Sequence, residues 1–417
     1  MRASAEPARQ LAGIANARVG PEGRLVDLEL RDGTITAVRD AGAQPAGGAV
    51  LDVAGRVVLP GLVDAHVHLD KAHILDRLPP DVDGLPAAIR ATSAIKETFT
   101  AEDVIARSER VLESLVRRGV TTVRAHAEVE PGAGLVSVET HLALRERWAD
   151  RVDLEIVAFA QEGVLRDRRT AELMDEAMRL GCDVVGVCPY ADVDGTAAID
   201  DGFARAEQWD VPLDLHLDFS DDPAVHLVDD VVRATVARGF EGRVAVGHMT
   251  SLGAMAPQDA QRRIEALAEA RVGVIALPAT DLFLSGRGVD RAWPRGLTRV
   301  LELIDAGVDV ALATNNHGNA FTPVAAHDPL RMAWLTVLMT HAPAGRWADL
   351  AGAVTTMARR VLGRAPGDIT TGATADLVVL EAGVPSDAVL VAPATTGVIR
   401  RGRWRATAPV AAPPALA

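Results

Sequence analysis

From residue 119 onward, the chain alternates between two hydrophobic patterns. Amphipathic stretches with the period of a helix alternate with short apolar runs that end in a polar residue, which is typical of βα units in a parallel sheet. Such units, with an opening run, predict a (β/α)₈ (TIM) barrel whose chemistry lies at the carboxyl ends of the strands. An open, doubly wound sheet is the alternative, but no glycine-rich phosphate turn follows any of the runs. The expected strands lie at residues 57–65, 120–126, 152–160, 182–188, 211–217, 243–247, 272–278 and 308–314.

Both ends of the chain have a different pattern. Short alternating segments surround turns such as Asp32-Gly33 near the start, and similar segments lie at 375–380 and 396–400. Because both ends are β-rich and flank the barrel, we expect one small β-sandwich built from the two termini. The expected division is 1–57 for the N-terminal part of the sandwich, 58–365 for the barrel, 366–407 for the C-terminal part and 408–417 for a loose tail rich in Ala and Pro.

The amino-acid composition of the chain bears on which partners it binds and in which compartment it is found. A net charge of -14 and an aromatic content of 3% argue against a nucleic-acid partner, which requires basic surface and stacking side chains. No stretch is long and apolar enough to cross a membrane, and the N-terminus lacks the apolar core of a signal peptide. Cys182 and Cys188 lie in one expected buried strand region, so no disulfide framework is implied. We therefore expect a cytoplasmic protein that forms a homo-oligomer and binds a small molecule.

Four histidines fall at the ends of expected strands. His66 and His68 lie where the first apolar run opens into a loop, and alternate residues of a strand face the same side, so the two can bind one metal ion. His216 and His248 follow the fifth and sixth strands. Three neutral imidazoles with an open coordination position suit Zn²⁺ or Fe²⁺ and leave room for an activated water. The pattern predicts a metal-dependent hydrolase.

Six motifs follow one another along the chain, namely Leu-Pro-Gly-Leu-Val-Asp-Ala-His-Val-His-Leu-Asp, Val-Arg-Ala-His, Ile-Val-Ala-Phe-Ala-Gln-Glu-Gly, Asp-Leu-His-Leu-Asp, Val-Gly-His-Met-Thr and Ala-Asp-Leu-Val-Val-Leu. In this order they resemble the amidohydrolase superfamily and, within it, the cytosine deaminase branch. The resemblance runs from about residue 50 to residue 400, and the stretch 154–188 is its most specific part. It implies a barrel with a terminal β-sandwich and a mononuclear metal site that activates water against a cyclic amidine or amide.

The resemblance also implies roles for five side chains. His66, His68 and His216 match the family's metal ligands. His248 matches the histidine that contacts the nucleophilic water, and Gln161 matches the glutamine that reads the amide edge of the substrate.

Two positions depart from the family pattern. Phe219 stands where the family has a glutamate that shuttles protons, and Asn315 stands where it has a metal-binding aspartate. Losing a positioned general acid or base typically costs about 10²- to 10⁴-fold in rate. A plain cytosine deaminase is therefore disfavoured, and the metal site need not be occupied as in the family.

Other polar groups at the same end of the barrel are candidates to replace the lost carboxylates. His248 is expected to carry the acid/base chemistry. Asp281, after the seventh strand, is a separate candidate for a catalytic base or polar anchor, whereas Asp218 is expected to be a structural acceptor beneath the site. The expected pocket-lining side chains are Gln161, His126, Phe219, Asn315 and Phe321, of which the two phenylalanines suggest a substrate less polar than cytosine. The loop residues expected to be solvated or structural are Asp70, Lys71, Asp221, Asp222 and His317.

Three functions remain open from the sequence. The first is metal-dependent hydrolysis of a C–N bond in a cyclic nitrogen compound, by deamination or amide or amine hydrolysis, with a modified proton relay. The second is a lyase, isomerase or cyclase on the same scaffold, in which no water is activated. The third is a catalytically inactive family member, which ranks last because loss of function usually removes metal ligands first and the histidines are retained.

Overall fold

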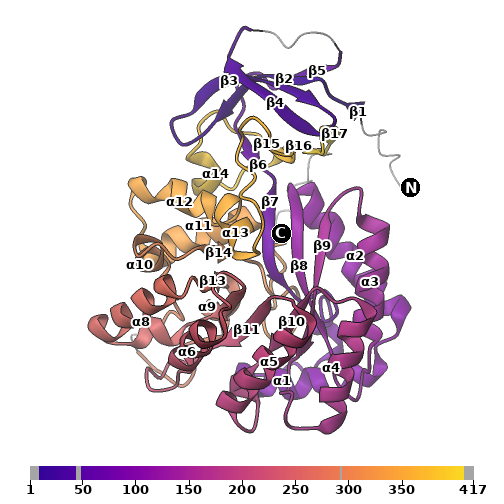
Figure 1. Cartoon of the computed structure of the whole chain (residues 1–417), viewed down its shortest axis with the longest axis vertical. Coiled ribbons are helices and arrows are strands. Elements are labelled where there is room, and N and C mark those ends of the chain that lie inside the picture. The colour runs from indigo at the N-terminus through magenta and orange to yellow at the C-terminus, as the bar shows by residue number, and fades with distance from the viewer. Residues whose placement is uncertain (1–8, 44–47, 292–293, 408–417) are drawn as a thin grey trace.

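The computed structural model describes residues 9–43, 48–291 and 294–407. Within them, eight parallel strands pair in chain order and wind into a nearly closed barrel (Figure 1), as predicted. Each observed strand overlaps the apolar run predicted for it. The barrel strands are β7 (Leu62–Val67), β8 (Val120–Glu128), β9 (Asp153–Ala160), β10 (Val184–Val187), β11 (Leu213–Leu217), β12 (Val244–His248), β13 (Gly273–Ala276) and β14 (Val310–Leu312).

Backbone contacts from one residue close the gap between the last and first barrel strands. The backbone N–H of Asn315, just after β14, donates to the carbonyl oxygen of His66 at 2.9 Å, and the N–H of His68 donates to the carbonyl of Asn315 at 2.9 Å. The barrel therefore closes at the point where predicted site residues from its first and last strands meet.

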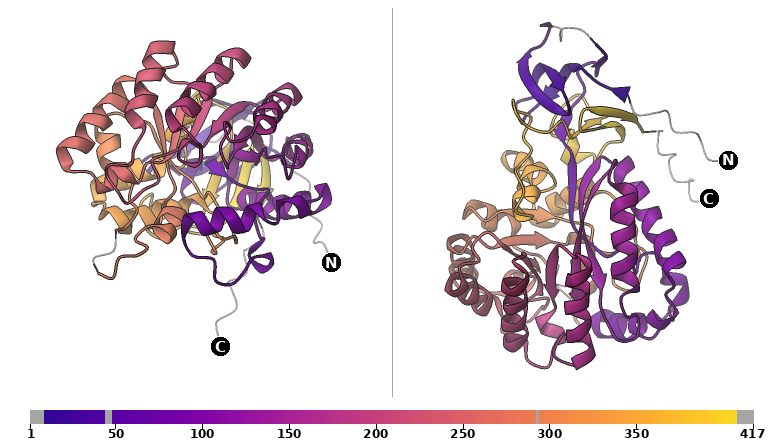
Figure 2. Two further views of the ribbon diagram at one scale, coloured as in Figure 1. Left: turned by 90° about the horizontal axis from the view of Figure 1, so that it is seen from below. Right: turned by 45° about the vertical axis from the view of Figure 1, so that its right-hand side comes forward.

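Helices surround the barrel, as the view along it in Figure 2 shows. In α2 the hydroxyl of Thr100 accepts the N–H of Asp103 at 3.3 Å, and Gly119 takes a φ of +97° just past the helix end, so sequence signals fix both ends. The helices are α1 (Gly84–Ser93), α2 (Ala101–Arg117), α3 (Val136–Trp148), α4 (Arg168–Leu180), α5 (Gly195–Trp209), α6 (Val228–Arg238), α7 (Ser251–Ala254), α8 (Pro257–Glu269), α9 (Pro278–Leu284), α10 (Val300–Asp305), α11 (Pro329–Thr340), α12 (Trp347–Gly352), α13 (Thr356–Val361) and α14 (Asp387–Leu390).

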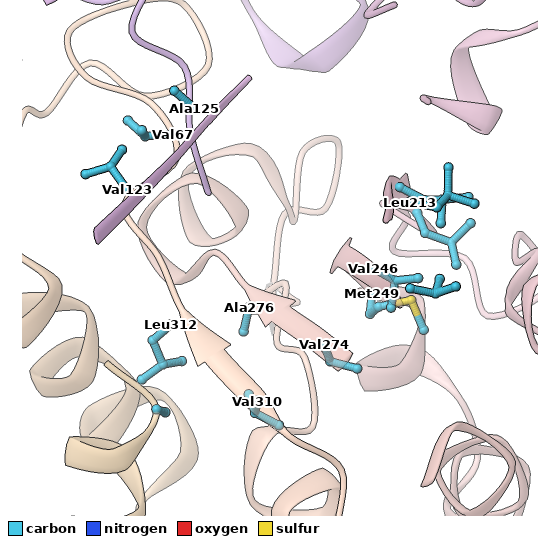
Figure 3. Packing of buried hydrophobic residues seen from close by; sticks show 14 of the residues in the cluster. Val67, Val123, Ala125, Leu213, Val246, Met249, Val274, Ala276, Val310 and Leu312 are labelled. Atoms are coloured by element: carbon cyan, nitrogen blue, oxygen red, sulfur yellow. The ribbon is translucent and has the colours of Figure 1, made fainter. Parts of the chain in front are cut away.

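The largest hydrophobic cluster joins the strands to the surrounding helices. Val246, Val274, Val310 and Leu312, from three neighbouring strands, are buried members of it (Figure 3). Burial of branched aliphatic side chains stabilises the fold by about 25 cal/mol per Å² of apolar surface removed from water. This packing holds the strand ends, and thus the site, in fixed positions.

The two ends of the chain form the predicted β-sandwich, drawn above the barrel in Figure 1. One sheet has the order β1-β17-β16-β15-β6 and joins both termini, and the other has the order β4-β3-β2-β5. Buried Ile14, Leu28, Leu377 and Ile399 belong to one cluster that draws on both sheets. The strands are β1 (Arg9–Gln10), β2 (Gly13–Val19), β3 (Arg24–Arg31), β4 (Thr34–Asp40), β5 (Val50–Asp52), β6 (Val58–Pro60), β15 (Leu377–Leu380), β16 (Thr395–Arg400) and β17 (Arg403–Ala406).

The apolar run at 57–65 is divided between two sheets, so the prediction of one strand there is wrong. Val58 pairs with Val379 in the sandwich, and the barrel strand begins only at Leu62. Gly61 lies between them, where an added Cβ would lie 2.3 Å from the hydroxyl oxygen of Thr121, so only glycine fits. The hydrophobic pattern is continuous across this change of sheet, and sequence periodicity alone does not reveal it.

The described helices include none that is both long and apolar enough to span a bilayer. Cys182 and Cys188 are free and buried. The predicted loose tail at 408–417 lies outside the described residues.

Candidate active site and metal centre

His66, His68 and His216 come together at the carboxyl ends of β7 and β11. The ring centroid of His66 lies 5.4 Å from that of His68 and 4.5 Å from that of His216. The Nε2 atoms of His68 and His216 are 3.2 Å apart. Two imidazole nitrogens that both carry lone pairs repel at this distance unless a proton or a cation lies between them, so the contact fits a shared ligand site.

The buried nitrogens of these histidines fit a metal ion. Both ring nitrogens of His66, and Nδ1 of His68 and of His216, have no hydrogen-bond partner among the described residues. Burial, with nearby histidines and Lys71, holds the pKa of all three well below the ordinary histidine value. They are therefore neutral, which is the form that binds a metal.

His126 and Asp214 offer a second set of donors. One ligand atom from each of His66, His126, Asp214 and His216 lies within 4.8 Å of the others. His126 Nε2 is already 3.2 Å from Asp214 Oδ1, and Asp214 also accepts from Arg124 at 3.0 Å. His126 was predicted to line the pocket, but it does not line the cavity described below. Asp214 was not predicted, although its position two residues before His216 on β11 gave it the same face of the strand.

His248 forms a pair with Asp281. Nδ1 of His248, the last residue of β12, lies 2.6 Å from Oδ1 of Asp281 on α9. Burial raises the pKa of Asp281 and the neighbouring His248 opposes that shift. His248 itself has a φ of +73°, which is strained for a residue with a side chain, so surrounding packing holds the ring in place.

The cavity at this end of the barrel is small, with a volume of about 10 Å³, which is room for about one water molecule. Four of the predicted pocket-lining residues are on its wall, namely Gln161, Phe219, Asn315 and Phe321. Asp281, proposed from the sequence as a catalytic base, is not on the wall but behind His248. The wall includes no carboxylate from the described residues; its other members are His68, Lys71, Leu85, Tyr190, His216, His248, Thr280, Leu284 and Asn316.

Phe219 and Asn315 are the two residues that stand where the resemblance implies a carboxylate, and the structure shows what each of them contacts. The ring of Phe219 lies 5.2 Å from that of His248, where it supplies an apolar wall. The Oδ1 atom of Asn315 accepts from Nδ2 of Asn316 at 2.8 Å, and its backbone has a φ of +61°. Asn315 is thus held by its neighbours, and its side-chain oxygen is neutral.

Asp218 is structural, as expected. Its carboxylate accepts the N–H of Leu227 at 2.7 Å and of Val228 at 3.1 Å, at the start of α6. Burial raises its pKa to about 7, against these hydrogen bonds.

Four of the loop residues expected to be solvated or structural divide into an exposed pair and a buried pair. Asp221 and Asp222 are exposed, as expected for solvated residues. Asp70 and His317 are buried and structural: Asp70 accepts the N–H of Glu128 at 2.9 Å, and Nε2 of His317 lies 3.0 Å from the hydroxyl of Thr314.

Lys71 is the residue that sequence reasoning placed least well. It was expected to be solvated or structural, but it is 1% exposed and lines the cavity. Its Nζ atom lies 2.5 Å from Oε1 of Glu128 and 2.8 Å from Oε1 of Gln161. Glu128 ends β8 and Gln161 follows β9, so the partners that bury Lys71 come from later strands. The sequence signal was its place three residues after His68, the second histidine of the first strand end.

Comparison with known proteins gives consistent matches. Residues 57–405 match the Amidohydrolase family. A pterin deaminase from Rhizobium rhizogenes is 30% identical over 382 residues, covering 90% of this chain and 87% of that protein. An N-isopropylammelide isopropyl amidohydrolase from a Pseudomonas species is 28% identical, covering 85% and 87%. The crystal structure of a 5-methylcytosine deaminase from Klebsiella pneumoniae, liganded with phosphonocytosine, has a TM-score of 0.89 and 28% identity, covering 94% and 97%.

Proposed function

The chain belongs to the amidohydrolase family, and we propose that it is a metal-dependent hydrolase that cleaves a C–N bond in a cyclic nitrogen compound. The relatives named above include a pterin deaminase and an N-isopropylammelide isopropyl amidohydrolase, both named for C–N chemistry on nitrogen-containing rings. The observation that carries the proposal is the group of three buried, neutral histidines with unpartnered nitrogens beside the His248–Asp281 pair.

We propose His66, His68 and His216 as the metal ligands, with Zn²⁺ or Fe²⁺ as the ion. Imidazole nitrogen suits both cations. A bound divalent cation supplies Lewis-acid chemistry, which lowers the pKa of water and polarises the bond under attack. We rank His126 below these three because its Nε2 atom already contacts Asp214, although its Nδ1 atom has no partner among the described residues.

The proton work falls to His248 in this proposal. An ionised Asp281 only accepts hydrogen bonds, so it keeps the proton of His248 on Nδ1 and leaves the lone pair on Nε2. His248 can then take a proton from water as the C–O bond forms, and return it to the nitrogen as the C–N bond breaks. Asp281 therefore acts as a positioning residue rather than as the base itself.

Gln161, Phe219, Asn315 and Phe321 are proposed to hold the substrate, because they line the cavity. Two phenylalanines give the ring apolar walls, and the two amides give it hydrogen-bonding groups. We also propose a homo-oligomer and a cytoplasmic location, the latter because both cysteines are buried and free.

A non-hydrolytic reaction on the same scaffold is the second candidate, favoured by the absence of carboxylates among the described residues of the cavity wall. The test is a screen of cyclic ureas, triazines, pterins, hydantoins and pyrimidines with the metal-loaded protein in H₂¹⁸O. We expect ammonia or amine release with one solvent oxygen in the ring product. Turnover without ¹⁸O in the product would establish the lyase or isomerase alternative.

A further inference from the structure

The Lys71 ammonium group has one donor left for a ligand. A lysine ammonium carries three N–H donors and no acceptor. Glu128 and Gln161 take two of these donors, and the described residues provide no third hydrogen-bond acceptor. The ammonium also lies 4.4 Å from the centroid of the Phe321 ring, at the cavity wall. A buried cation therefore faces the space where the substrate is proposed to bind.

Lys71 also fixes the orientation of Gln161. Because an ammonium group only donates, the oxygen of the Gln161 amide must face Lys71, and the Nε2 end is turned away from it. Among the described residues, that Nε2 has only a weak sulfur partner, Sγ of Cys188 at 3.8 Å. Lys71 and Gln161 together thus offer N–H donors, and one of the two lone pairs of the Gln161 oxygen is already taken by Lys71.

A charge network behind the wall keeps Lys71 in place. Glu128 contacts both Lys71 and Lys96. The Nζ atom of Lys96 lies 2.9 Å from Oε2 of Glu128 and 3.1 Å from an Oε1 atom of both Glu130 and Glu162. Burial alone would raise the pKa of Glu128, but the two ammonium groups hold it below the ordinary value. Glu128, the carboxylate paired with Lys71, does not line the cavity, so the Lys71 ammonium is the charged group of this pair that reaches the cavity wall.

We propose that the cavity selects an anionic ring compound, whose negatively charged oxygen or ring nitrogen accepts N–H donors from both Lys71 and Gln161. The substrate would supply the negative charge that the carboxylate-free wall lacks, either as an ionised ring amide or as a ring carboxylate. This inference rests on the proposed function, because it assigns the substrate class of the same site.

The test measures binding to the metal-loaded full chain by isothermal titration calorimetry. Three probes are compared. Cyanurate is a ring anion at mildly alkaline pH, orotate carries a ring carboxylate, and uracil is neutral. We expect at least one of the anions to bind about tenfold or more tightly than uracil, as a charge-assisted hydrogen bond to a buried ammonium requires. The anion that binds identifies the source of the charge.

Three variants test whether Lys71 causes the preference for an anion over uracil. Lys71→Met should abolish it, because the variant should lose much more affinity for the anion than for uracil. The double variant Lys71→Met/Glu128→Gln keeps the buried charges balanced and should behave in the same way if the single variant folds poorly. Lys96→Met is the matched control, since it removes an ammonium from the same network without touching the cavity, and should keep the preference.

Several outcomes overturn the inference. These are equal affinity for anions and uracil, no binding of any probe by the metal-loaded protein, a preference that survives in both Lys71 variants, or its equal loss in Lys96→Met. A chain that takes up no metal instead contradicts the proposed function, and metal analysis of the same samples distinguishes the two failures.

Discussion

The imidazole of His248 is held by the carboxylate of Asp281 at 2.6 Å, from the N-terminal part of a helix that follows the neighbouring barrel strand. Asp281 is 1% exposed and lies behind the ring, whereas His248 reaches the cavity. The two residues therefore have different roles: His248 faces the cavity, and Asp281 fixes the tautomer of the His248 ring.

His248→Gln should lower kcat by about 10²-fold or more, because glutamine keeps some hydrogen bonding but cannot shuttle a proton. Metal content and thermal stability should stay nearly unchanged. Steady-state kinetics on the compound found in the release screen, with metal analysis of the same sample, checks this. Loss of metal in step with activity would instead make His248 a structural or ligand residue.

Asp281→Asn should also lower kcat, by a smaller factor than His248→Gln, since the amide can hold the ring but allows the other tautomer. Its effect should be absent when His248 is already glutamine, because a positioning residue acts only through its partner. A double variant much slower than His248→Gln alone would mean that Asp281 handles protons independently.

Restoring the family carboxylates tests how far the pocket has diverged. Phe219→Glu with Asn315→Asp should raise any trace of cytosine or isocytosine deamination, because it returns a proton shuttle and an anionic ligand. Each single change should help less than the pair if both act on one water. The measurement is ammonia release by the folded, metal-loaded variants, and no gain would mean that substrate recognition has changed as well.

Glu130 should make stability depend on pH. Burial raises its pKa to about 8 from an ordinary value of 4.5, with Glu128 and Glu162 adding to the shift and Lys96 opposing it. The folded chain thus holds this proton more tightly than the unfolded chain, and stability falls as the pH rises from 4.5 to about 8.

Glu130→Gln should therefore flatten the dependence of the melting temperature on pH in that interval. Glu139→Gln, at an exposed position, is the matched control and should leave the wild-type slope. An unchanged slope in Glu130→Gln would show that other groups dominate the titration.

The barrel could be predicted because its strands and helices carry different periods, and the histidines because each lies at a strand end. Gly61 marks what periodicity misses: the apolar run continues while the chain passes from the sandwich to the barrel. The burial of Lys71 was not predictable for a different reason. Its partners Glu128 and Gln161 are 57 and 90 residues further along the chain. The local sequence shows only a charged loop residue, and the buried ion pair forms when the fold brings these distant residues together.

Asp281 and His126 illustrate the limit on assigning roles. The sequence places both at strand ends, but it does not say which side chain reaches the cavity and which supports a neighbour. That distinction depends on distances of a few ångströms, here the 2.6 Å contact of Asp281 with His248 and the 3.2 Å contact of His126 with Asp214.

The most direct test of the account is the metal content of protein purified without added metal, measured by inductively coupled plasma mass spectrometry. The wild-type chain should hold about one divalent Zn or Fe ion, His68→Ala should lose it, and His126→Ala should keep it, because His126 is already paired with Asp214. A metal-free wild type that takes up no Zn²⁺ or Fe²⁺, or a His68→Ala variant that retains a full complement of metal, would contradict the proposed metal centre.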